Sequence, residues 1–353
     1  TLELIADGQK ERHNVQIHPT RPWQVNFVQH VHTDIGYTRP QTEILGEHIR
    51  YIDYALDYCD LTDDYPDDAR FRWTCESSWA GEQYLRTRPA SQIERLKRRI
   101  REGRIEVTGM LFNFSELPDE QSLAASLEPI RTFREAGLPV ETAMQNDVNG
   151  IAWCLADYLP ELGVRYLNMG THGHRALTCF DHPTLFRWQS PSGSEMIAYR
   201  ADHYHTGNFL GIEKGNFEQF EQKLLEYLSQ LEAKGYPYDI TAIQFSGYLT
   251  DNAPPSTAAC EMIRRWNEKY DYPKLRSAVS AEFFKEAEAR YYARMPVLRE
   301  AWPDWWTDGF GAAARETAVS RYTHADLTAI RTALAIARLL GEETPAACEA
   351  ELA

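Results

Sequence analysis

The chain has 353 residues and a formal net charge of −15 at pH 7. That length is sufficient for one or two domains with a large core. The acidic excess argues against nucleic acid as a partner, because phosphate binding requires a clustered basic face. No apolar run reaches the roughly 18 residues that a membrane-spanning helix needs. We therefore expect neither a nucleic-acid partner nor a membrane span.

The cysteine pattern bears on the compartment. Closely spaced cysteine frameworks are typical of small secreted domains, and this chain has no such framework. We expect reduced, mostly buried thiols and a cytoplasmic location. No signal peptide is visible, but the chain begins with Thr1, so a removed N-terminus leaves secretion open. The cysteines are Cys59, Cys75, Cys154, Cys179, Cys260 and Cys348.

The predicted secondary structure alternates between strands and helices. This alternation is typical of parallel strands joined by crossover helices, in either a barrel or an open doubly wound sheet. After Trp302 the strand pattern is lost. In chain order we predict strand 24–29, helix 43–59, strand 70–75, helix 91–101, strand 105–109, a helix opening at 117–121, strand 141–145, a helix closing at 158–163, strand 165–169, a hairpin with arms 185–188 and 196–200, helix 217–234, strands 240–245 and 276–279, and helix 328–340.

The first predicted strand ends in residue types that bind metals. It runs directly into His30, His32 and Asp34. Alternate residues of a strand face the same side, so these three side chains share one face if the strand persists. Two imidazoles and a carboxylate suit zinc or a similar divalent ion. The alternative is a pair of histidines packed in a core.

Other candidates follow later strands, because the carboxyl ends of parallel strands build the site in both architectures. For Asp147 we favour a functional role, because the residues around it lack the apolar spacing of a helix. Glu76 is equally well explained as the neighbour of a helix cap, and Asp119 and Glu120 as acids at a helix start. Four later histidines are explained equally well as surface residues and as ligands. The remaining candidates are His172, His174, His203, Tyr204, His205 and Asp251.

Taken together, these residues resemble glycoside hydrolase family 38, the α-mannosidases. Residues 30–37, His-Val-His-Thr-Asp-Ile-Gly-Tyr, are similar to the family's His-x-His-x-Asp-x-Gly-Trp motif. The resemblance covers roughly residues 23–340. Weaker landmarks follow in the family's order at 107–109, 118–120, 145–147, 186–194, 247–256 and 295–300.

The resemblance implies a fold and a division into domains. It implies an α/β fold with a seven-stranded (β/α) barrel over 23–300, preceded by an N-terminal extension over 1–22. Residues 301–353 would then be the start of a C-terminal helical bundle, truncated at the end of the chain. The family's fourth zinc ligand lies in a His-His-Asp segment of that bundle, and this chain has no such segment.

The resemblance also implies roles for individual residues. His32, Asp34 and Asp147 would bind zinc or another divalent metal. Asp147 would also be the nucleophile and Asp251 the general acid/base of a metal-dependent retaining glycoside hydrolase. Such enzymes need two carboxyl groups about 5–5.5 Å apart. The substrate would be an α-mannosidic or related carbohydrate, contacted by His30, which would also orient a ligand, and by Tyr37, Glu76 and Tyr204.

Departures from the family pattern keep alternatives open. Tyr37 replaces the family tryptophan, 148–152 replaces Pro-Phe-Gly-His-Ser, and Ala253 and Pro254 replace glycines. These changes predict altered sugar pockets. One alternative is a metal-dependent amidohydrolase or phosphoesterase, in which two of the later histidines share an ion with His32. Another is a non-catalytic carbohydrate-binding relative, in which Asp251 points away from the pocket. The sequence does not predict an oligomeric state.

Overall fold

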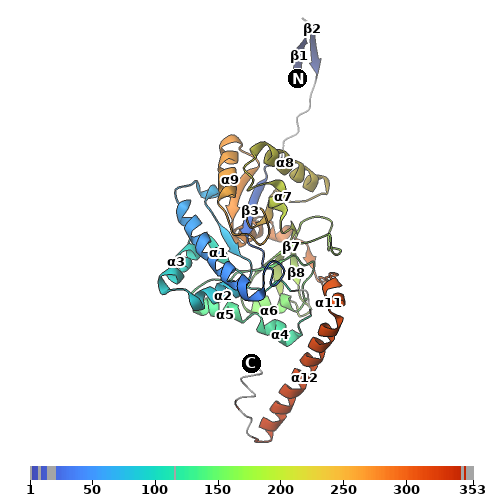
Figure 1. Cartoon of the computed structure of the whole chain (residues 1–353). Coiled ribbons are helices and arrows are strands. Elements are labelled where there is room, and N and C mark those ends of the chain that lie inside the picture. Colours follow the sequence, from blue (N-terminus) through green and yellow to red (C-terminus); the bar gives the residue numbers. More distant parts are fainter. Residues whose placement is uncertain (1, 7–8, 14–20, 115–116, 343–345, 347–353) are drawn as a thin grey trace.

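The computed structural model describes residues 2–6, 9–13, 21–114, 117–342 and 346. Figure 1 shows strands at the centre of the main body with helices around them. One sheet consists of the parallel strands β10 (Ile240–Ser246), β3 (Gln24–His30) and β11 (Lys274–Ala278), with β3 in the middle. Nearly all of β3 is buried, as expected for a strand of a parallel sheet that is covered on both faces.

A larger sheet carries the next site-bearing strands. It is mixed, because β8 and β9 form the predicted antiparallel hairpin while the other pairs are parallel. A separate parallel pair joins β4 (Trp73–Cys75) to β5 (Ile105–Val107). The strands of the large sheet, in spatial order, are β12 (Val297–Leu298), β8 (Thr184–Gln189), β9 (Glu195–His203), β7 (Tyr166–Thr171) and β6 (Thr142–Asn146).

The fold is therefore α/β with mixed sheets, and a closed seven-stranded barrel is not shown. The parallel strands belong to separate hydrogen-bonded sheets. Individual hydrogen bonds link the sheets: the Gly109 amide donates to the Thr142 carbonyl at 3.0 Å, and the Arg72 amide to Ser277 Oγ at 3.2 Å. Such links align neighbouring strands but do not join them in a continuous ladder. The structure differs at these junctions from the closed barrel that the family resemblance predicted.

The helices of the main body surround the sheets (Figure 1). The predicted helices at 43–59, 91–101 and 217–234 are confirmed, whereas the sequence did not single out α9 and α10. Asp119 caps α4 by accepting a hydrogen bond from the Ser122 amide at 2.8 Å, so its expected place at a helix start is confirmed. The helices are α1 (Gln41–Leu61), α2 (Ser78–Thr87), α3 (Ala90–Arg101), α4 (Glu120–Ala125), α5 (Glu128–Glu135), α6 (Leu155–Glu161), α7 (Thr206–Leu210), α8 (Phe217–Ala233), α9 (Ala258–Lys269), α10 (Ser280–Tyr291), α11 (Asp308–Ala312) and α12 (Ala314–Leu339).

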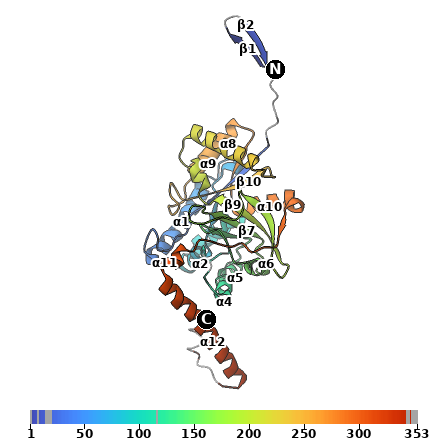
Figure 2. The same ribbon diagram turned by 90° about the vertical axis from the view of Figure 1, so that its right-hand side faces the viewer.

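The two ends of the described chain extend away from this body. Both views place the hairpin of β1 (Leu2–Ala6) and β2 (Gln9–His13) beyond one side and α12 beyond the other (Figures 1 and 2). No residue of α12 is buried. A lone helix does not establish a bundle, so the predicted bundle is unconfirmed and the domain boundaries stay predictions.

The membrane and cysteine predictions can be compared with the described residues. None of the helices there has the length and apolar character of a membrane span. No disulfide joins the five described cysteines. Cys59, Cys75 and Cys260 are buried, whereas Cys154 and Cys179 are half-buried. Cys348 lies outside the described residues. The cytoplasmic location stays a prediction.

Candidate metal centre

His32, Asp34 and Asp147 lie together, although they come from two different sheets. His32 and Asp34 follow β3, and Asp147 follows β6. His32 Nε2 lies 3.6 Å from Asp34 Oδ1 and 3.5 Å from Asp147 Oδ2. One ligand atom from each residue falls within 4.8 Å of the others. The structure thus brings together the three residues that the sequence suggested as ligands.

This donor set fits a small divalent cation. Zinc ligands lie near 2.0–2.2 Å from the ion, so two ligands of one ion are at most about 4.4 Å apart. Both contacts of His32 Nε2 satisfy that limit. One imidazole and two carboxylates form a mixed donor set that zinc accepts, and carboxylate-rich sites also suit harder ions.

A fully buried carboxylate, that of Glu76, stands behind His32. It lies at the end of β4, where its Oε1 is 3.0 Å from His32 Nδ1 and its Oε2 is 2.5 Å from His30 Nδ1. Asn113 Nδ2 and Asn146 Nδ2 donate to it at 2.5 and 2.8 Å. A carboxylate on one imidazole nitrogen directs the other nitrogen toward a metal. Glu76 therefore fixes the orientation of His32.

Burial and charge act in opposite directions on this pair. Burial alone would lower the pKa of His32, but the Glu76 charge and the contacts with Asp147 and Asp34 raise it well above its usual range. Burial alone would raise the pKa of Glu76, but His32 and His30 hold it well below its usual range. Without a metal, the pair therefore favours a charged imidazole beside a charged carboxylate.

The backbone at Asp147 is strained. Its φ is +59°, in the left-handed region that a residue other than glycine rarely adopts. The Asp147 amide donates to the Gly170 carbonyl at 3.0 Å, and Asn113 Oδ1 accepts from the Asn146 amide at 2.8 Å. Strain of this kind persists where surrounding contacts impose it, often at functional sites. Here it turns the carboxylate toward His32.

Asp251 is linked to His32 through the Tyr204 side chain and through the backbone. The Tyr204 hydroxyl donates to Asp251 Oδ2 at 3.2 Å, and its ring centre is 4.5 Å from that of His32. The His32 amide donates to the Asp251 carbonyl at 3.0 Å. The Asp251 carboxylate is thus connected to the metal-capable group through a buried tyrosine.

A cavity of about 780 Å³ opens onto the three ligand candidates. Tyr37 belongs to its wall and is 87% exposed, whereas His30 and Glu76 are buried behind His32. The lining residues do not include Asp251 or Tyr204. The wall is completed by Thr33, Ile35, Gln41, Phe112, Asn113, Phe114, Asn146, Val148, Trp306, Gly309 and Phe310.

The four later histidines stay outside the ligand group. Among the described residues, none of them joins His32 in a metal-capable cluster. His172 Nδ1 lies 2.9 Å from Asp147 Oδ1, and its ring is 3.8 Å from that of His174 and 4.8 Å from that of His203. The amidohydrolase or phosphoesterase alternative required two of these histidines on the ion, and the geometry does not support it.

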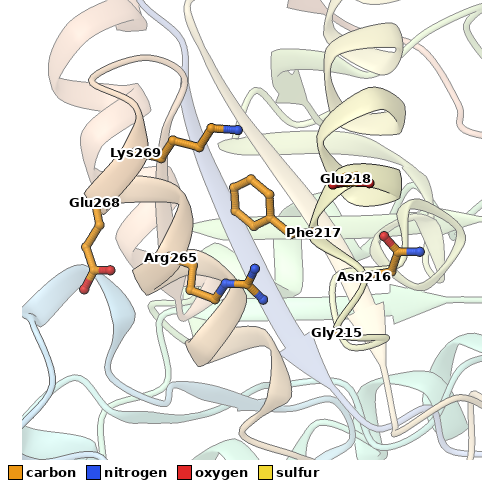
Figure 3. A pocket seen from close by; sticks show the side chains of 7 residues that line it. All are labelled: Gly215, Asn216, Phe217, Glu218, Arg265, Glu268 and Lys269. Atoms are coloured by element: carbon orange, nitrogen blue, oxygen red, sulfur yellow. The ribbon is translucent and has the colours of Figure 1, made fainter.

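A second hollow, of about 730 Å³, lies between the start of α8 and the end of α9. Figure 3 shows Phe217 between Arg265 and Lys269. Arg265 Cζ and Lys269 Nζ are each 5.0 Å from the centre of the Phe217 ring, so both cations pack against it. This hollow does not contain the metal-capable group.

Sequence reasoning missed several residues that shape the site. Asn113 and Asn252 hydrogen-bond to its carboxylates, and Trp306 lines the cavity with its ring 5.3 Å from that of His172. A lone asparagine in a loop has no spacing pattern. Asn252 does directly follow the candidate Asp251, which was the only available signal for it.

Comparisons with known proteins identify the family of this chain. A comparison with curated proteins found no match. The solved structure of an α-mannosidase from Enterococcus faecalis V583 matches with a TM-score of 0.63 at 15% identity, covering 79% of this chain and 31% of that one. A protein in the glycosyl hydrolase family 38 from Enterococcus faecalis matches with a TM-score of 0.54 at 12% identity, covering 80% and 29%.

At these identities the likeness to solved structures shows the fold, and this chain spans about a third of their length. The family is shown by sequence. Residues 22–308 match the model of the glycosyl hydrolases family 38 N-terminal domain, which is most of the chain. The chain therefore belongs to glycosyl hydrolase family 38.

Proposed function

We propose that this protein is a metal-dependent retaining glycoside hydrolase that cleaves α-mannosidic or related α-glycosidic bonds. The observation that carries the proposal is the convergence of His32, Asp34 and Asp147 at a cavity of about 780 Å³. A cavity of that size accommodates a small carbohydrate. Family membership supports glycoside hydrolysis as the class of reaction.

The proposed roles follow from where each group lies. Asp147 borders the cavity and is the nucleophile that attacks the anomeric carbon. Asp251, held by the Tyr204 hydroxyl, protonates the leaving oxygen and later activates water. A divalent cation on His32, Asp34 and Asp147, zinc in our proposal, would supply Lewis acidity toward the sugar hydroxyls. The cavity wall, including Tyr37, would contact and position the sugar.

Replacing the nucleophile tests this mechanism. Asp147→Asn is expected to abolish turnover of aryl α-mannoside while sugar binding stays measurable by calorimetry. Asp181→Asn changes an exposed aspartate outside the cavity and is the matched control. Proton NMR of the first product formed by the wild type should show a retained anomeric configuration, because a covalent intermediate requires it. An inverted first product would disprove the proposed mechanism.

A second candidate function has one specific observation in its favour. Asp251 is not among the described residues that line the cavity. A protein that binds a sugar at the metal centre without cleaving it would have this arrangement. Asp251→Asn separates the two functions: loss of turnover with sugar binding retained supports the hydrolase, while a wild type that binds mannose without turnover supports the binding protein.

A further inference from the structure

The two oxygens of Asp34 face different partners. Oδ1 lies 3.6 Å from His32 Nε2, on the side of the proposed cation. Oδ2 accepts a hydrogen bond from Asn252 Nδ2 at 2.6 Å. The Asp34 amide donates back to Asn252 Oδ1 at 3.2 Å. The Asn252 side chain therefore uses its donor and its acceptor on the same residue, which fixes the plane of the Asp34 carboxylate.

The backbone around Asn252 is also attached to the site. The Tyr51 hydroxyl, from α1, donates to the Asn252 carbonyl at 3.2 Å. The Asn252 amide donates to Asp251 Oδ1 at 3.0 Å, and the Asp251 carbonyl accepts from the His32 amide at 3.0 Å. Two proposed metal ligands are thus connected to the two consecutive residues 251 and 252, more than 200 positions away in the chain.

We propose that Asn252 is a positioning residue that couples occupation of the metal centre to the placement of Asp251. The inference rests on the proposed function, because it concerns the same site. A cation that binds Asp34 Oδ1 fixes the carboxylate, and the paired hydrogen bonds pass that restraint to Asn252 and to its neighbour Asp251. By linkage, a displaced 251–252 segment weakens cation binding in return.

Only a carboxamide fits this contact. Its Nδ2 donates to an oxygen of Asp34 and its Oδ1 accepts from an amide, so both ends are satisfied. A carboxylate at position 252 would place one anion against another. An alanine there would leave Asp34 Oδ2 without the Nδ2 donor. Asn252 is only 9% exposed, so water does not readily replace the lost amide.

Two variants of position 252 test the coupling without substrate. Asn252→Asp keeps the shape of the side chain but replaces the Nδ2 donor with an acceptor oxygen. Asn252→Ala removes both the donor and the acceptor. Asn216→Asp is the matched control, because Asn216 is a helix cap on α8 whose acceptor role an aspartate retains. Zinc affinity is measured by calorimetry. Hydrogen exchange of 247–254 is measured by mass spectrometry with and without saturating zinc.

In the wild type and in Asn216→Asp, zinc should slow exchange of segment 247–254. Both variants at position 252 should bind zinc about 10–100-fold more weakly, as expected for loss of a partner of a metal ligand. At saturating zinc they should also lose the zinc-dependent slowing. Slowing that persists in Asn252→Ala, or unchanged affinity in both variants, would overturn the inference.

The outcome is independent of turnover. If the wild type cleaves no glycoside but shows the zinc-dependent slowing, and both variants at 252 lose it, the coupling is established while the proposed hydrolase fails. If the wild type cleaves glycosides and the slowing persists without Asn252, the coupling alone fails. A wild type that does not bind zinc overturns the inference together with the metal assignment.

Discussion

Glu76→Gln is the substitution that most directly probes how the centre is held. The carboxylate is fully buried and meets donors on both oxygens: the His32 imidazole is near Oε1, and the His30 imidazole and the Asn146 amide are near Oε2. Glutamine keeps the shape but places an amide nitrogen against one of these donor sets. Removing one partner from a buried charge pair typically costs about 3–5 kcal/mol.

The same change should weaken metal binding. Without Glu76, His32 loses the charge that raises its pKa and the partner that orients its ring. Loss of such a partner lowers metal affinity about 10–100-fold, or about 1.4–2.8 kcal/mol. Urea denaturation measures the stability change, and zinc calorimetry on the folded variant measures the affinity change.

Glu106→Gln is the control for burial alone. Glu106 is another buried carboxyl, in β5, with contacts to Thr74 Oγ1 and the Ala281 amide. It should not alter zinc affinity. If Glu76→Gln folds and binds zinc as tightly as the wild type, then Glu76 does not orient His32 for metal binding, and that role is wrong.

Three further predictions follow from local contacts. Zinc affinity should rise with pH, because a cation must displace the proton that the raised pKa of His32 retains; calorimetry at several pH values, with proton release, measures this. Burial raises the pKa of Glu106 to about 7, so the Glu106 carboxyl destabilises the fold increasingly as the pH rises from about 4.5 to 7. Glu106→Gln should therefore stabilise the fold by about 3 kcal/mol at pH 8 but little at pH 5, as measured by urea titration. Gly150→Ala would place a Cβ 2.3 Å from the Asp304 amide nitrogen, so it should cost about 1–3 kcal/mol in thermal unfolding.

Local patterns in the sequence predicted much of the fold. The extended apolar run before Gln29 was enough to predict a strand, and β3 ends at His30. The metal-binding role that the His-x-His-x-Asp spacing suggested stays a prediction. The closed barrel was inferred from the family instead. Whether adjacent strands form a continuous ladder depends on backbone register across separate elements, which the side-chain pattern does not encode.

The candidate site was predictable only where chemistry and spacing coincide. Glu76 had a competing explanation as a helix-cap neighbour, and the structure shows its carboxylate turned to His30 and His32 instead. Asn252 reaches Asp34 across 218 positions. No period or local motif predicts a contact of that range, because it depends on the parallel pairing of β3 with β10.

The charges around His32 indicate what a bound cation would offset at this centre. Three carboxylates, those of Glu76, Asp34 and Asp147, each have an oxygen within 3.6 Å of a His32 ring nitrogen. Like charges held this close are costly around an imidazole that is almost fully buried. One proton on His32 offsets part of that cost, which is why its pKa is raised. A divalent ion would offset more of this repulsion. In the metal-free protein a proton on His32 takes the place that the ion would occupy beside Asp34 and Asp147.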